Sequence, residues 1–171
     1  MEYLIDCFLR AQRENYFLGA KLVRGSYMEK ERALAEKLNY PSPINSTKEA
    51  TDSMYEGAIR FCMAHLDRIV FCAGTHNEKS SMLVVNTMKE KNLPANHPHI
   101  FFSQLLGMSD HISYNLASAG YNVSKYVPYG PVRDVIPYLI RRAQENTSVK
   151  GQTGRELGLI LKERERRSQK R

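Results

Sequence analysis

The chain has 171 residues, of which 42% are hydrophobic and 25% are charged, and its formal net charge is +7. These values are ordinary for one soluble globular domain with a sizeable core. No apolar run approaches the ~20 residues that a membrane-spanning helix needs, and the acidic start Met-Glu-Tyr-Leu-Ile-Asp predicts no signal or transit peptide.

Hydrophobic periodicity and capping residues predict one leading helix followed by strands that alternate with helices. In chain order we expect a helix at 1–16, a buried strand at 17–23, a helix at 28–38, and a longer helix that is capped by Asn45 or Ser46 and runs to about 65. Next come a strand at 68–73, a helix that is capped by Asn77 and runs to about 91, and a short strand at 100–104. The last elements are a helix that Ser109 or Asp110 opens and that runs to 119, a strand at 123–127, and a helix at 134–146 with Pro137 in its first turn.

The positive charge is concentrated at the end of the chain. Residues 150–171 contain eight Lys/Arg and three Glu, a net charge of +5, which leaves +2 for the first 149 residues. We therefore divide the chain into residues 1–149 and a basic tail at 150–171. Its mixed charges favour a solvated helical end, with contact to anionic membrane or nucleic acid as the alternative. We expect no nucleic-acid partner.

Cysteine and histidine spacing predicts no metal site. Three cysteines are an odd number without metal-ligand spacing, which indicates free thiols in a reducing, intracellular compartment. His97 and His99 lie in a Pro-rich loop without nearby cysteines.

The repeated order of strand and helix implies parallel strands with right-handed crossovers. Both a doubly wound sheet and a barrel have this order, but no Gly-x-Gly-x-x-Gly follows any strand, which argues against a dinucleotide-binding fold. Polar residues instead follow the strand ends, as a (β/α)8 barrel active site requires. They are Arg24, Thr75, His76, Gln104 and Tyr126.

The last helix of residues 1–149 carries a polar face. Its members, spaced so that they share one side of the helix, are Tyr138, Arg141, Arg142 and Glu145. Two guanidiniums on one face form a fork suited to a carboxylate or a phosphate. The alternative is that Arg141 and Arg142 are ordinary surface charges.

Several blocks, in this order, resemble the flavin-dependent proline dehydrogenase family. They are Lys-Leu-Val-Arg-Gly-Ser-Tyr at 21–27, Pro-Ile-Asn-Ser-Thr at 43–47, Thr-His-Asn at 75–77, Gln-Leu-Leu-Gly-Met at 104–108, and Tyr126 followed by Tyr138, Arg141-Arg142 and Glu145-Asn146. The resemblance covers residues 1 to about 165. It implies an α/β fold that is part of a (β/α)8 barrel of the TIM type, roughly units five to eight with a leading helix, because a complete barrel takes ~250 residues.

The resemblance implies oxidation of L-proline to 1-pyrroline-5-carboxylate, the first step of proline degradation, with hydride transfer to FAD and onward transfer of electrons to a quinone or another membrane acceptor. Arg141 and Arg142 would clamp the substrate carboxylate. Tyr126 and Tyr138 would wall the pocket, and Glu145 would hold the arginines. Leu105 would give the pocket apolar shape, although core packing is its simpler interpretation.

The resemblance also implies a flavin site. Lys21 would be the catalytic cation near the reactive nitrogen of the flavin, where many family members carry arginine. The Arg24-Gly25-Ser26 turn would approach the cofactor, with Tyr27 supporting it, and Thr75 and His76 would contact the ribityl-phosphate side. The alternatives are a lysine that reaches out of a strand end and a hydrogen-bonded structural histidine.

Three hypotheses follow for the chain itself. It is the second half of a proline dehydrogenase that works with the missing half of the barrel, a catalytically incompetent half-barrel that acts as an oligomerising or partner-binding module, or a nucleic-acid or membrane-surface module. We favour the first and expect an intracellular location, either mitochondrial or in the bacterial cytoplasm, including the periphery of the inner membrane.

Overall fold

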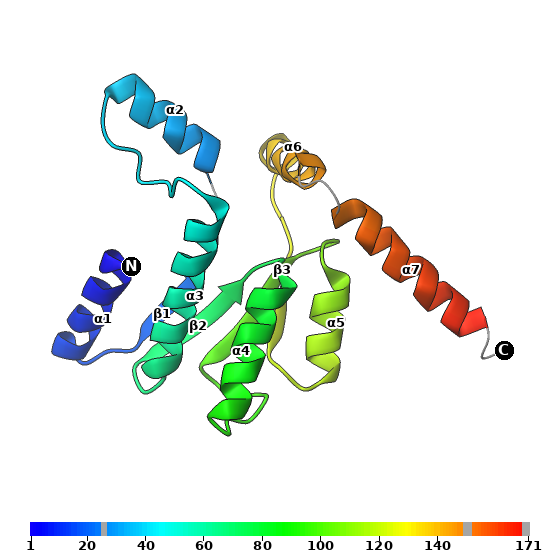
Figure 1. The fold of residues 1–171 in the computed structure, drawn as a ribbon, viewed down its shortest axis with the longest axis horizontal. Helices are drawn as coiled ribbons and strands as arrows, with labels where there is room; N and C mark the ends of the chain where they lie inside the picture. Colours follow the sequence, from blue (N-terminus) through cyan, green and yellow to red (C-terminus); the bar gives the residue numbers. More distant parts are fainter. Residues whose placement is uncertain (25–26, 149–151, 169–171) are drawn as a thin grey trace.

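The computed structural model describes residues 1–24, 27–148 and 152–168, with the side chains of 143–156, 160 and 163 outside the description. The fold is α/β, with four parallel strands in the order β1-β2-β3-β4 (Figure 1). The elements are α1 (Glu2–Glu14), β1 (Leu18–Leu22), α2 (Met28–Leu38), α3 (Lys48–Ala64), β2 (Ile69–Gly74), α4 (Glu78–Glu90), β3 (Ile100–Leu105), α5 (Asp110–Ser118), β4 (Val123–Tyr126), α6 (Val132–Ser148) and α7 (Gln152–Ser168).

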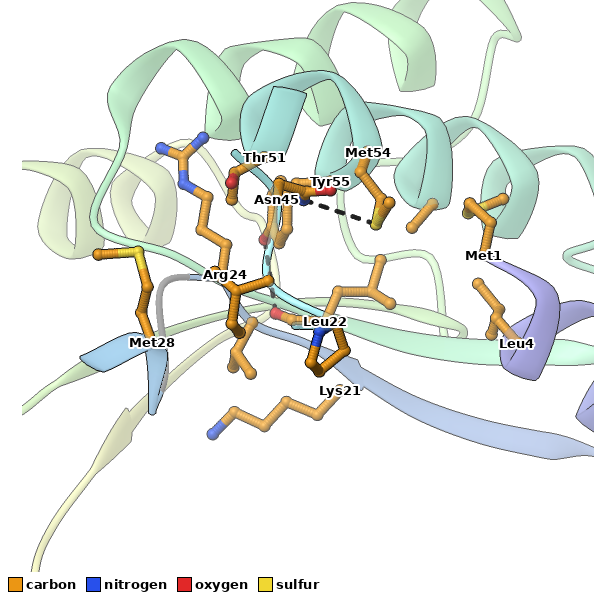
Figure 2. Close-up of a pocket in the computed structure, with 14 residues that line it drawn as sticks. Met1, Leu4, Lys21, Leu22, Arg24, Met28, Asn45, Thr51, Met54 and Tyr55 are labelled. Atoms are coloured by element: carbon orange, nitrogen blue, oxygen red, sulfur yellow. Dashed lines mark hydrogen bonds between the residues drawn. The ribbon is translucent and has the colours of Figure 1, made fainter. Parts of the chain in front are cut away.

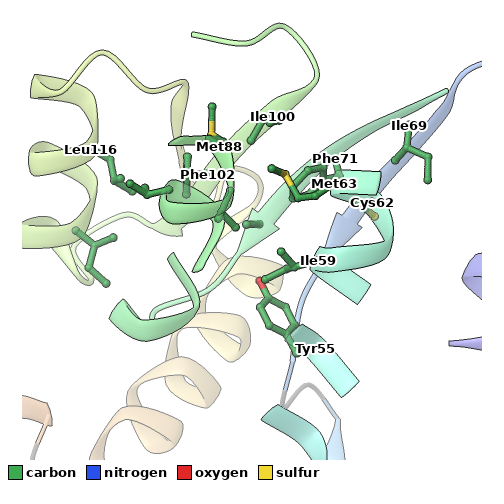
Figure 3. Packing of buried hydrophobic residues seen from close by; sticks show 14 of the residues in the cluster. Tyr55, Ile59, Cys62, Met63, Ile69, Phe71, Met88, Ile100, Phe102 and Leu116 are labelled. Atoms are coloured by element: carbon green, nitrogen blue, oxygen red, sulfur yellow. The ribbon is translucent and has the colours of Figure 1, made fainter. Parts of the chain in front are cut away.

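Helices α3, α4 and α5 cover one face of the sheet (Figure 1). Strand residues such as Phe71, Ile100 and Phe102 project toward these helices and are at most 1% exposed. They meet Ile59 of α3 and Met88 of α4 in a single apolar core, shown in Figure 3. Burial of this face provides the main hydrophobic stabilisation of the fold.

We call the opposite side of the sheet the open face. Because successive strand residues alternate in direction, it consists of Gly19, Lys21, Val70, Cys72, Gly74, Phe101, Ser103, Leu105, Ser124 and Tyr126. Apart from Ser103, these residues are half-buried or exposed. A parallel sheet is usually covered on both faces, so the open face is a surface at which further structure is expected.

The first strand differs from its prediction. The run of apolar residues predicted a buried strand, but β1 is an edge strand whose residues are half-buried or exposed. The flanking Phe17 and Val23 are 54% and 53% exposed. An apolar run indicates that a strand is suited to burial. Whether the strand is buried depends on the elements that pack against it, and β1 pairs with β2 alone among the described strands.

Two helix starts also differ from their predictions. The cap of α3 is Thr47, whose Oγ1 accepts a hydrogen bond from the Ala50 amide at 3.1 Å, instead of Asn45 or Ser46. Helix α6 begins at Val132, two residues before the predicted start, so Pro137 lies beyond the first turn. None of the described helices has both the length and the apolarity needed to cross a membrane.

The contribution of the Thr47 cap to stability can be measured by substitution. Thr47→Ala should lower the free energy of unfolding by about 1 kcal/mol, because the Ala50 amide loses its side-chain acceptor. Urea unfolding at one protein concentration measures the change. Ser46→Ala is the matched control and should change the free energy little; equal effects of the two variants would contradict the assignment of the cap.

Candidate active site

A row of four side chains runs from β1 to α6 near the carboxyl ends of the strands. The Lys21 Nζ lies 5.4 Å from the centroid of the Tyr126 ring, and the Tyr126 and Tyr138 ring centroids are 6.0 Å apart. The Arg142 guanidinium carbon lies 5.2 Å from the centroid of the Tyr138 ring. We call these residues the cation–tyrosine row. Two cations flanking two aromatic rings suit a small anionic ligand with an apolar body.

The sheet register explains how the row is assembled. Tyr126 is the last residue of β4 and pairs with Leu105 of β3, so both side chains belong to the open face. Lys21 belongs to the same face, three strands away on β1. Three strand spacings amount to ~14 Å, so Lys21 and Tyr126 meet only because their long side chains reach toward each other over the open face.

Helix α6 places its two arginines in different environments. Both lie on the predicted polar face, but Arg142 is half-buried beside Tyr138 whereas Arg141 is exposed. Of the predicted arginine pair, Arg142 is therefore the member that belongs to the cation–tyrosine row. The predicted contact of Glu145 with the arginines concerns a side chain outside the described residues.

Arg24 lies on the other side of β1 from Lys21. Figure 2 shows its side chain extending toward α3, while the Lys21 ammonium points away from that helix. Arg24 forms an ion pair with Asp52, and its guanidinium carbon lies 5.4 Å from the Tyr55 ring centroid. A hydrogen bond from Lys48 and the charge of Arg24 lower the pKa of Asp52. These contacts tie the end of β1 to α3.

The described part of the predicted turn that follows Arg24 begins at Tyr27, which is not part of the cation–tyrosine row. Gly25 and Ser26 lie outside the described residues. Tyr27 precedes α2 with a positive φ of 58° and is 73% exposed.

Thr75 and His76 belong to a polar network at the ends of β2 and β3. The Gln104 amide donates to the Thr75 carbonyl at 3.1 Å, and the Ser113 hydroxyl donates to the Gln104 side-chain oxygen at 2.8 Å. His76 Nδ1 and Ser109 Oγ are hydrogen-bonded at 3.0 Å. Because Gln104 is only 2% exposed, these bonds fix the strand ends in a buried setting.

Sequence patterns did not indicate the role of Lys125. On β4 it faces the helices, and its Nζ donates to the Asp110 carboxylate at 2.6 Å and to the Met108 carbonyl at 2.8 Å. These bonds hold the loop between β3 and α5, which also carries Ser109. The one relevant feature of the sequence is strand alternation, which places the side chains of Lys125 and Tyr126 on opposite faces of the sheet.

A cavity of about 370 Å³ lies beside β1 and shares only Lys21 with the cation–tyrosine row. Its lining is mainly apolar and comes from the N-terminal helix α1, the end of β1 with the two residues after it, the start of α2, the loop at 43–45 and α3 (Figure 2). Lys21 contributes to the lining, while its ammonium lies against Tyr126. The cavity therefore does not contain the cationic end of the site.

The sheet is parallel and a polar site lies at the carboxyl ends of its strands, which is the arrangement found in α/β enzymes. The family model described as proline dehydrogenase matches residues 1–155, and the chain belongs to that family. It is 46% identical over 161 residues to the mitochondrial proline dehydrogenase 1 of Homo sapiens, covering 92% of this chain and 27% of the relative. It is 42% identical over 168 residues to the Drosophila melanogaster protein of the same name, covering 92% and 25%.

Among solved structures, proline utilization A from Bdellovibrio bacteriovorus, inactivated by N-propargylglycine, is similar with a TM-score of 0.80 and 26% identity. The match covers 87% of this chain and 15% of that protein. The chain thus spans about a quarter of the length of the curated relatives named above.

Proposed function

We propose that residues 1–171 supply units five to eight of a (β/α)8 proline dehydrogenase barrel, which oxidises L-proline to 1-pyrroline-5-carboxylate as the first step of proline degradation. The observation that carries the proposal is the cation–tyrosine row, because family membership would not by itself require this chain to retain the site. The row gathers residues from β1, β4 and α6 at one edge of the sheet.

The row suits proline in size and charge. Arg142, with Arg141 beside it on α6, binds the substrate carboxylate by charge-assisted hydrogen bonds. The tilted rings of Tyr126 and Tyr138 wall the apolar pyrrolidine ring, and Leu105 provides an apolar surface next to Tyr126. These contacts orient the substrate, which is the main contribution that a protein makes to a cofactor-dependent oxidation.

The residues present also fit FAD. The open face offers exposed surface beside the cation of Lys21, while Thr75 and His76 lie at the neighbouring strand end, where they would bind the ribityl-phosphate side. When bound there, FAD would supply the acceptor for the hydride that proline loses from the carbon next to its nitrogen, with a quinone as the onward electron acceptor. Lys21 holds a positive charge beside the site at which negative charge develops.

Lys21 provides a direct test of the flavin site. In a complete barrel that carries these residues, Lys21→Ala should shift the flavin reduction potential downward, because the anionic reduced form loses a nearby cation. Redox titration against a reference dye measures the shift. Lys30→Ala, on the exposed surface of α2, is the control; an unmoved potential in Lys21→Ala would remove Lys21 from the flavin site.

The partner of residues 1–171 is the other half of the barrel, either on the same polypeptide or on a separate one. The exposed edges β1 and β4 and the open face are the surfaces that four further strands would cover. The names of the fly and human relatives place those proteins in mitochondria. We therefore assign this chain an intracellular location, mitochondrial or in the bacterial cytoplasm.

Reconstitution tests the proposal as a whole. Residues 1–171 should be combined with a polypeptide that supplies the first four barrel strands, and flavin absorption and proline-dependent bleaching should be recorded. We expect flavin absorption and proline-dependent bleaching only when both polypeptides are present. A complex that assembles without binding flavin would instead support the incompetent, partner-binding module.

A further inference from the structure

Gly74 is the last residue of β2 and lies on the open face next to the stem of Lys21. A Cβ atom at this position would lie 2.9 Å from Val23 Cγ1, 3.0 Å from the Leu22 carbonyl oxygen and 3.1 Å from Lys21 Cε. Real Cβ atoms show such short contacts very rarely, so an alanine at 74 would require a neighbour to move. The stem of Lys21 thus passes through space that only glycine leaves free.

We propose that Gly74 is a positioning residue for Lys21. Its missing Cβ lets the lysine stem lie against the end of β2, and this path brings the ammonium to 5.4 Å from the Tyr126 ring centroid. The placement of Lys21 can be tested by itself, whereas its consequence for the flavin rests on the function proposed above.

The three short contacts differ in how easily they yield. The Leu22 carbonyl belongs to the backbone of β1, which is paired with β2, so its movement would disturb the sheet. Val23 is 53% exposed and can change its rotamer. The Lys21 stem has four rotatable bonds and an exposed side chain, so an added methyl group displaces it most readily.

Gly19 offers a matched control on the same face. It lies on β1, two residues before Lys21, and a Cβ at this position would meet no heavy atom within 4 Å. Gly19→Ala and Gly74→Ala add the same methyl group to strands of the same sheet. Only the second should move the lysine.

The test is carried out on the full chain without flavin, in whichever assembly it forms. Lysines are reductively methylated with a ¹³C label, which retains their charge. The methyl resonance of Lys21 is the one that disappears in Lys21→Ala. The Tyr126 ring displaces the chemical shift of this resonance, and the size of that displacement is the change in shift seen in Tyr126→Leu. Gly74→Ala should abolish more than half of this displacement, while Gly19→Ala should preserve it.

Preserved displacement in Gly74→Ala, or equal losses in the two glycine variants, would overturn the inference. If Gly74→Ala fails to fold, the double variant Val23→Ala/Gly74→Ala removes the shortest contact and retains the contact with Lys21. Loss of the displacement in that folded variant supports the inference. Failure of both variants to fold overturns it, because Gly74 would then serve strand packing alone.

A second measurement distinguishes this inference from the proposed function. In a flavin-loaded complete barrel, Gly74→Ala should lower the reduction potential in the same direction as Lys21→Ala, and the two changes should not add. Loss of the ring-induced displacement in Gly74→Ala, together with an unmoved potential in both Lys21→Ala and Gly74→Ala, would support Gly74 as a positioning residue and contradict the flavin role of Lys21.

Discussion

Arg142→Met should raise the KM for L-proline by about 10- to 100-fold in a complete barrel that carries residues 1–171, while flavin content stays unchanged. Each lost charge-assisted hydrogen bond to a carboxylate is worth about 1.5–3 kcal/mol, and 1.4 kcal/mol corresponds to a factor of ten. Arg142 is half-buried and its guanidinium carbon lies 5.2 Å from the Tyr138 ring centroid, so its charge is less screened by solvent than that of a fully exposed arginine. Methionine retains much of the length of the side chain without the charge.

The two arginines of α6 need separate variants because their environments differ. Arg141→Met should also raise the KM, and by a smaller factor, since Arg141 is exposed and its interaction is screened by solvent. Arg133→Met is the matched control on the same helix, because its side chain is 86% exposed and lies next to Asp134. Unchanged KM values in both Arg141→Met and Arg142→Met would remove the carboxylate clamp from the proposal.

Purified residues 1–171 should associate at micromolar concentration instead of remaining monomeric, and they should bind flavin weakly or not at all. In the described part of the chain, β1 and β4 each pair with a strand on one side only, and unpaired strand edges are templates for association. The open face adds partly exposed apolar side chains such as Val70, Phe101 and Leu105. Aggregation, dimerisation and binding of the other barrel half are all ways to cover these surfaces.

Analytical ultracentrifugation combined with absorption in the flavin band measures this outcome. Alkylation of the cysteine thiols adds a local signal. The reactivity of Cys72 reports whether the open face is covered, whereas Cys62 is fully buried in the core. Burial raises the pKa of the Cys62 thiol to about 12, so it should stay unreactive in the folded chain. A cooperatively unfolding monomer with stoichiometric flavin would contradict the prediction and make the chain an enzyme in its own right.

The sequence by itself determined the elements, their order and the residues at the strand ends. Periodicity and caps placed α2 at Met28–Leu38 and identified Asn77 as the cap of α4. Alternation of strand and helix led to the parallel sheet. These features depend on short stretches of chain, in which propensity, capping and turn residues act over a few positions, and the motif blocks identified the family for the same reason.

Only the tertiary structure decided which of these residues meet. Lys21 and Tyr126 are 105 positions apart and come together because β1 and β4 share one face of the sheet. Arg24, only three residues from Lys21, turns instead to Asp52 on α3. The exposure of β1 and the space that Gly74 leaves for Lys21 likewise depend on neighbouring strands. Local sequence sets the direction of a side chain along its element, whereas its partners are set by the packing of elements distant in the chain.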